Sequence, residues 1–186
     1  MPLTASLHMQ RNKTIHLVIL ASALLSLLLV STTYHSFTFA QNSQTKFRAK
    51  LDSNNEVPPL NSTVEGIASF KLKDNAINTK INITGITDLS GAQILTGKTG
   101  ENGVPIVDLL KTGKKTAIPG GISIVGSFTA SDLEGAMKGK DLAALQSAMG
   151  TNETYVNIKT KDHPDGEIRG QIKPKGSSSP TPTPAQ

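Results

Sequence analysis

Apolar and polar side chains alternate with a period of two over most of the chain between residues 45 and 175. In KFRAKL, Phe47, Ala49 and Leu51 alternate with charged residues, and GIASFKL and INTKINI repeat the pattern. Successive residues of a strand point to opposite faces of a sheet, so these stretches are predicted to be half-buried β-strands. Similar runs recur in VPIVDLL, GISIVGSF, TYVNIKT and EIRGQIK. Such strands predict an all-β fold, a Greek-key β-sandwich or barrel of about seven or eight strands with one short connecting helix.

Turn-forming residues separate two pairs of the predicted strands. Lys73-Asp74-Asn75 lies between the second and third strands, and His163-Pro164-Asp165-Gly166 lies between the last two. Asn, Asp, Gly and Pro favour tight turns, so each pair is expected to form a hairpin.

One segment, SDLEGAMKGKDLAALQSAMG, departs from the strand pattern. Ser131 is followed three residues later by Glu134, as in a capping box. Leucine and methionine then recur at helical spacing, and Gly150 provides a stop signal. The connecting helix is therefore expected here, centred on residues 141–149.

The first 40 residues have the order of a secretory signal. Arg11 and Lys13 precede the apolar stretch 17–30, and a small-x-small site ends at Ala40. The 14 apolar-dominated residues would make a helix of about 21 Å, shorter than the roughly 30 Å membrane core. We expect residues 1–40 to be a cleaved signal peptide and the protein to be secreted or at the cell surface. The ten residues before Ala40 are long for a cleavage region, which leaves an uncleaved N-terminal anchor as the alternative.

The C-terminal residues 175–186 consist mostly of Ser, Thr and Pro. Such a composition buries too little apolar surface to offset its ordering entropy, so a disordered tail is predicted. Residues 45–174 are then expected to form a single β domain.

The charge of the chain is mild. Without residues 1–40, 17 basic and 14 acidic residues remain, a net charge of +3. They are dispersed along the sequence, so nucleic-acid binding is not expected. The densest basic cluster, Lys111, Lys114 and Lys115, is interpreted as a solvated loop. The chain has no cysteine, which excludes disulfides, thiolate nucleophiles and thiolate metal sites.

Several short motifs occur in the order seen in one known family. They are Asn55-Glu56-Val57-Pro58-Pro59, Gly66, Asn102-Gly103-Val104-Pro105, Asp108-Leu109, Tyr155-Val156-Asn157 and Gly166-Glu167-Ile168-Arg169-Gly170-Gln171. With these motifs, residues 47–173 resemble the CHRD (chordin) domain, as a prokaryotic-type exported single-domain member. The resemblance implies an extracytoplasmic all-β module found in animal chordins and in prokaryotic exported proteins, and it does not imply an enzyme. The family-motif residues expected to be structural are Glu56, Pro58, Asn102, Gly103, Asn157, Gly166, Glu167, Arg169 and Gly170.

The chain departs from that family at three positions. Members commonly carry a His-x-His segment before the Asn-Gly-Pro turn and a histidine after the Tyr-Val-Asn strand. The matching residues here are Gln93, Leu95 and Lys159. A leucine and a protonated lysine offer no lone pair, so no metal site and no cofactor are expected.

His163 is the only histidine after residue 40, and it lies beside Asp162 and Asp165. We interpret it as part of a solvated turn, with weak metal binding as the alternative.

Glu167 and Arg169 lie on one face of the last predicted strand. One hypothesis is an anion clamp, because a guanidinium binds carboxylates with two hydrogen bonds. The other, which we favour, is an ion pair that ties this strand to its neighbours, with Glu56 or Asp108 as cross-strand partner. No nucleophile or general base accompanies the pair, and no nucleophile elbow is present. No catalytic residue is therefore predicted.

Three glycosylation sequons begin at Asn61, Asn82 and Asn152. Asn61 and Asn152 fall in predicted loops and Asn82 on the outward face of a strand. They are candidate glycosylation sites if the host glycosylates exported proteins.

These observations favour a non-catalytic exported module that binds an unknown extracellular protein or glycan. Membrane contact is expected only through an uncleaved N-terminal segment. One alternative is a metal-binding or redox protein of superoxide-dismutase-like architecture that has lost its histidine ligands. A third hypothesis is a hydrolase working through Glu167 or Asp108.

Overall fold

The structure is a computed structural model that describes residues 45–176. The predicted signal peptide and nearly all of the predicted tail lie outside the described residues. Among the described residues no helix is long and apolar enough to cross a membrane.

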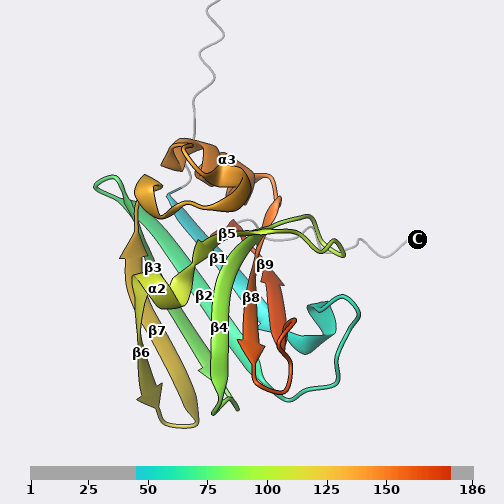
Figure 1. Ribbon diagram of the computed structural model, residues 1–186. Coiled ribbons are helices and arrows are strands. Elements are labelled where there is room, and N and C mark those ends of the chain that lie inside the picture. The colour runs from blue at the N-terminus through green and yellow to red at the C-terminus, as the bar shows by residue number, and fades with distance from the viewer. Residues whose placement is uncertain (1–44, 177–186) are drawn as a thin grey trace, which may run out of the picture. The chain divides into compact units, whose positions relative to one another are not determined.

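The described part of the chain forms one antiparallel sheet, which confirms the all-β prediction (Figure 1). Its strands are β1 (Lys46–Asp52), β2 (Glu65–Lys73), β3 (Ala76–Thr84), β4 (Leu89–Thr96), β5 (Pro105–Asp108), β6 (Gly113–Ile118), β7 (Gly121–Phe128), β8 (Thr154–Thr160), β9 (Ile168–Gln171) and β10 (Lys173–Pro174). The strand order is β5-β4-β8-β9-β1-β2-β3-β7-β6, and β10 pairs with β1. Within residues 45–176 there are thus ten strands rather than seven or eight, because short strands at the edges carry little alternation of their own.

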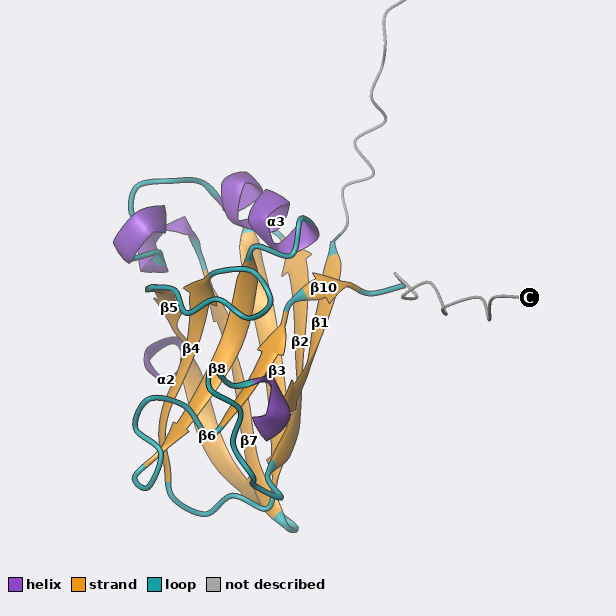
Figure 2. Ribbon diagram, turned by 90° about the vertical axis from the view of Figure 1, so that its right-hand side faces the viewer, coloured by secondary structure: helices purple, strands orange, loops and turns teal. Residues whose placement is uncertain are grey.

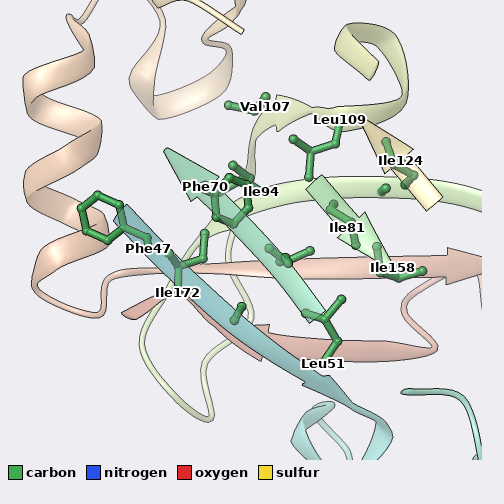
Figure 3. Packing of buried hydrophobic residues seen from close by; sticks show 14 of the residues in the cluster. Phe47, Leu51, Phe70, Ile81, Ile94, Val107, Leu109, Ile124, Ile158 and Ile172 are labelled. Atoms are coloured by element: carbon green, nitrogen blue, oxygen red, sulfur yellow. The ribbon is translucent and has the colours of Figure 1, made fainter. Parts of the chain in front are cut away.

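The sheet curls, so that β4, β8 and β9 lie in front of β1, β2, β3 and β7 (Figure 1). Three connections carry the chain between the two halves. They are the turn from β3 to β4, the helix α2 (Leu109–Thr112) between β5 and β6, and the segment from β7 to β8. The core lies between the halves (Figure 3), where residues such as Leu51, Ile81 and Ile158 are fully buried.

Both predicted hairpins are confirmed. β2 and β3 pair through Lys73 and Ala76, and the intervening Asp74 and Asn75 have φ of 49° and 60°, as a two-residue turn of the hairpin type requires. β8 and β9 pair from Tyr155–Gln171 to Ile158–Ile168.

The connecting helix is also confirmed. α3 (Leu142–Gly150) begins after Asp141, whose side chain accepts a hydrogen bond from the Ala144 amide at 2.8 Å. Figure 2 shows it over one end of the sheet. The expected capping box at Ser131 was wrong. Thr129 and Asp132 form the box instead, on the 3-10 turn η2 (Ala130–Asp132), and a second such turn, η3 (Gly135–Met137), follows.

The basic segment 111–115 is not a loop, as had been expected. Lys111 lies in the last turn of α2, and Lys114 and Lys115 belong to β6, which pairs with β7. β6 is an edge strand, exposed along most of its length. It therefore lacks the apolar alternation by which the other strands were recognised.

The first and last strands of the domain are neighbours. β10 pairs with the start of β1, with Phe47 opposite Pro174 and Arg48 opposite Lys173. Figure 2 shows β10 beside β1.

Candidate functional site

The outer surface of β4, β8 and β9 is covered by three polar segments. In the register of these strands, Gln93 lies opposite Asn157 and Asn157 lies opposite Arg169. Their neighbours Ile94, Val156 and Ile168 point to the core. The covering segments are the loop after the 3-10 turn η1 (Ser53–Asn55), the β4–β5 loop and the β8–β9 turn. Motifs that are far apart in the sequence therefore meet on one face.

Arg169 is the largest fully buried side chain of this surface, with 2% exposure. Its guanidinium lies 3.5 Å from the centroid of the Tyr155 ring. It donates to the Asn102 side-chain oxygen at 3.1 Å, to the Lys98 carbonyl at 3.1 Å and to the Glu101 carbonyl. The expected ion pair with Glu56 or Asp108 was wrong, because Arg169 forms no ion pair within the described residues. Asp108 instead caps α2, accepting from the amides of Leu110 and Lys111.

Two asparagines join the covering loops to β9. Asn102 accepts from Arg169, and its amide donates to the Val57 carbonyl at 3.1 Å. Asn55 donates to the Arg169 carbonyl at 3.0 Å. The motifs that contain Asn55 and Asn102 are therefore both hydrogen-bonded to Arg169 of β9.

Close backbone contacts account for two of the motif glycines. A Cβ on Gly103 would lie 1.5 Å from the Thr96 carbonyl oxygen, and the Gly103 amide donates to the Tyr155 hydroxyl at 3.1 Å. A Cβ on Gly166 would lie 2.5 to 2.8 Å from the Asn157 amide and both carboxyl oxygens of Glu56. Any larger residue at position 166 would displace that carboxyl group.

Glu56 is 7% exposed and lies between Gly166 and Asn157. Its Oε2 accepts from the Asn157 amide at 3.4 Å, whereas Oε1 has no hydrogen-bond partner within the described residues. Burial raises the pKa of Glu56 to about 7, and the nearby Glu167 adds to the effect, although the charges of Arg169 and Lys159 oppose it. This carboxyl group therefore titrates near neutral pH.

Glu167 is held by hydroxyl groups rather than by Arg169. Ser62 Oγ donates to its Oε1, and Thr160 Oγ1 donates to its Oε2 at 3.0 Å. His163 Nε2 lies 3.4 Å from the same Oε2. Glu167 thus joins the η1–β2 loop to β8 and to the β8–β9 turn.

A pocket of about 560 Å³ opens beside these groups. Glu56 and Asn157 line it together with the apolar residues Val57, Leu60 and Leu95. Its remaining lining residues are Pro58, Asn102, Gly103, Pro105, Tyr155, Lys159, Asp162, His163, Pro164, Asp165 and Gly166. The predicted motif residues Glu56, Pro58, Asn102, Gly103, Asn157 and Gly166 therefore share one pocket, whereas Glu167, Arg169 and Gly170 support it from β9 and the residue before it.

The three residues that stand where CHRD domains commonly carry histidine also lie in or beside the pocket. Leu95 and Lys159 line the pocket, and Gln93 pairs with Asn157 beside it. Among residues 45–176, no three His, Asp or Glu side chains lie where they could hold a metal ion together.

The sequence did not reveal three of the contacts that build the site. Tyr155 was noted only as a motif residue, not as the ring beneath Arg169. Ser62 was not singled out as the partner of Glu167. Gln171 Nε2 donates to the carbonyls of Gly97, Asn152 and Thr154. No local pattern indicates such contacts, since each joins segments distant in sequence.

The three sequon asparagines, Asn61, Asn82 and Asn152, are all exposed. Asn82 lies on the outward face of β3, as expected, and its side-chain oxygen accepts from Ser123 Oγ at 2.9 Å.

Comparison with known proteins gives one family. The model of the family described as the CHRD domain matches residues 47–172. No curated protein matches the chain.

Proposed function

The chain belongs to the CHRD domain family, and we propose that it is an exported, non-catalytic module that binds an extracellular protein or glycan in the pocket beside Glu56. Export is inferred from the sequence of residues 1–40. The binding role is inferred from the polar groups that line the pocket.

One observation carries the binding proposal. Glu56 Oε1 and Asn157 Oδ1 are both buried, both belong to pocket-lining residues, and neither has a hydrogen-bond partner within the described residues. Buried polar atoms in folded proteins are nearly always hydrogen-bonded. A ligand that brings N–H or O–H donors, such as an amine, an amide or a sugar hydroxyl, would satisfy both acceptors once the side chains that cover them move aside.

The rest of the pocket suits such a ligand. Val57, Leu60 and Leu95 supply apolar wall, and Lys159, Asp162 and Asp165 supply charge. The lining is about as polar as it is apolar, which suits a polar ligand such as a peptide or a sugar better than an apolar one.

The arrangement around Glu167 supports a non-catalytic role. In the Ser-His-Asp triad of hydrolases, the histidine lies between the serine and the carboxylate. Here both Ser62 and His163 contact the carboxylate of Glu167. Asp108 is occupied in capping α2. Neither carboxylate suggested for a hydrolase is therefore placed to activate a nucleophile.

The proposal is tested with the full chain on arrays of extracellular glycans and peptides. Leu60→Arg places a large cation at the pocket wall, and Glu56→Gln removes the carboxylate while keeping its shape. We expect both variants to bind the selected ligand at least about tenfold more weakly, the scale of one lost charged hydrogen bond. Ala143→Arg, which adds the same side chain at an exposed position of α3 outside the pocket lining, serves as the matched control.

Two outcomes contradict the proposal. If every selected ligand binds Leu60→Arg as tightly as the unaltered chain, the pocket is not a binding site. Turnover of a bound ligand that Glu56→Gln abolishes would show the pocket to be catalytic.

A further inference from the structure

The outward side chains of β1, β2, β3, β7 and β6 form a second surface, here called the basic face. None of its cations belongs to the pocket lining. Its exposed cations are Lys46, Arg48, Lys50, Lys71, Lys73, Lys80 and Lys114. They are dispersed along the sequence, but strand alternation brings them to one side of the sheet, since the residues between them point to the core.

Most of this charge is not neutralised by neighbours. Lys50 pairs with Asp52 at 3.6 Å and Lys73 with Asp74 at 3.4 Å. Within residues 45–176, four of the other cations form no ion pair: Arg48, Lys71, Lys80 and Lys114. The acidic residues of these outward strand positions, Asp52 and Glu65, lie opposite each other in the last row of the β1–β2 pairing. The middle of the face is therefore positive and its far end is acidic.

The cations of the central row are regularly spaced. Arg48 lies opposite Ser69, Ser69 opposite Lys80, Lys80 opposite Val125, and Val125 opposite Lys114. Neighbouring strands are about 4.8 Å apart, so cations on alternate strands repeat at about 10 Å. This repeat is comparable to the length of two sugar units in an extended polysaccharide.

Most of the groups between the cations are small and polar, and two are apolar, Ile67 opposite Lys50 and Val125 between Lys80 and Lys114. Ser69, Asn78 and Ser127 are exposed on the same face. A depression of about 410 Å³ lies here, lined in part by Ser69, Lys71, Asn78, Lys80 and Val125. Hydroxyl and amide groups beside cations provide donors and acceptors for sugar hydroxyls as well as for acidic groups.

Aromatic side chains are missing from this surface. Every aromatic residue of the described part of the chain, Phe47, Phe70, Phe128 and Tyr155, is buried. Single-stranded nucleic acids are bound largely by stacking on exposed aromatic rings. Proteins that lie on membranes insert aromatic and large apolar side chains, whereas the exposed large apolar side chains of this face are only the single β-branched residues Ile67 and Val125.

We propose that the basic face binds a linear acidic polysaccharide laid across the strands, with its carboxylates near Arg48, Lys80 and Lys114. Charge complementarity supplies the attraction, and the serine and asparagine side chains contact the sugar hydroxyls. This surface and its ligand class are separate from the pocket, so either site functions without the other.

The test measures binding of the full chain to hyaluronan, which carries one carboxylate per disaccharide, with uncharged dextran as the reference polymer. Arg48→Glu/Lys80→Glu reverses two cations of the central row. The matched control is Lys138→Glu/Lys140→Glu, which changes the net charge equally at exposed positions outside the face.

We expect the unaltered chain to bind hyaluronan but not dextran, and we expect this binding to weaken with added salt. The face variant should bind at least about tenfold more weakly, with a flatter salt dependence, while the control and Leu60→Arg bind normally. Thermal unfolding of each variant confirms that it is folded.

Other outcomes overturn the proposal. Equal weakening in the two double variants would mean that only net charge matters. Tighter face-dependent binding to vesicles of anionic phospholipid would make a membrane the partner, and tighter binding to oligothymidine would make it a nucleic acid. Loss of hyaluronan binding in Leu60→Arg alone would assign the polysaccharide to the pocket.

Discussion

At the scale of single residues, the guanidinium of Arg169 is buried without a carboxylate partner in the described residues. Its hydrogen bonds go to two loop carbonyls and to Asn102, and its face lies on Tyr155. A guanidinium suits this position because it is planar, makes several hydrogen bonds in fixed directions and stacks on rings. Arg169 therefore ties the β4–β5 loop to β9.

Replacement of Arg169 by alanine should destabilise the domain. It leaves the part-buried Glu101 carbonyl without its Arg169 donor and the Lys98 carbonyl with only the Glu101 amide, and it removes the group that packs on Tyr155. A buried polar group that loses its partner costs about 1 to 3 kcal/mol. At about 3 °C per kcal/mol for a domain of this size, we expect the thermal midpoint to fall by more than about 5 °C in calorimetry. Arg169→Lys should restore only part of the loss, because an ammonium group lacks the planar fork. Lys114→Ala, at an exposed position, is the control. An Arg169→Ala protein with the same thermal midpoint as Lys114→Ala would contradict the structural role of Arg169.

The pKa of Glu56 is strongly affected by its surroundings. Its pKa is raised from 4.5 to about 7, chiefly by burial, so the folded protein binds this proton more tightly than the unfolded chain does. Its contribution to stability is constant below pH 4.5, declines as the pH rises from 4.5 to about 7 and is constant again above that range. The loss amounts to at most about 3 kcal/mol.

Glu56→Gln should remove this pH dependence. We expect its thermal midpoint, relative to that of the unaltered chain, to be several degrees higher at pH 8 than at pH 4. Glu65→Gln, at an exposed glutamate, should show no such change. A constant difference for Glu56→Gln across this range would mean that the carboxyl group titrates normally in the folded protein.

At the scale of elements, strands and turns with strong local signals were predictable. The β2–β3 hairpin follows from alternation on both sides of Asp74 and Asn75, and α3 follows from helical spacing after Asp141. α2 was missed because Leu109 and Leu110 extend the apolar run VPIVDLL, so it was interpreted as one strand. Asp108, which caps α2, was the available signal. β6 was missed because tertiary pairing with β7, not its own sequence pattern, makes it a strand.

The β8–β9 turn contains His163, the single histidine of the described residues. We therefore expect metal binding to be weak. One imidazole, 3.4 Å from Glu167, offers too few ligands for the geometry that copper or zinc prefers. Titration followed by calorimetry should show binding weaker than micromolar, and His163→Ala should abolish it. Stoichiometric sub-micromolar binding that survives His163→Ala would show that other residues form a metal site.

At the scale of the whole molecule, many residues of the site could be predicted from sequence motifs, but the pocket that they form could not. Glu56, Asn102 and Asn157 were singled out from motifs, yet their meeting depends on β4, β8 and β9 being neighbours. No local pattern specifies that order. The clustering of positive charge could not be predicted for a related reason. The lysines and the arginine are dispersed along the sequence, but the β1–β2–β3–β7–β6 register places them on one face of the sheet.

The pairing of β10 with β1 makes the domain easy to recombine with other proteins. Because both ends leave from adjacent strands, the whole unit can be inserted into a surface loop of a host protein without forcing the host's chain apart. The same closeness permits circular permutation, in which a short linker joins the old ends and new ends are opened at an exposed turn such as that around Gly120. A gene segment encoding this fold can therefore move between architectures as an insertion as readily as at a terminus.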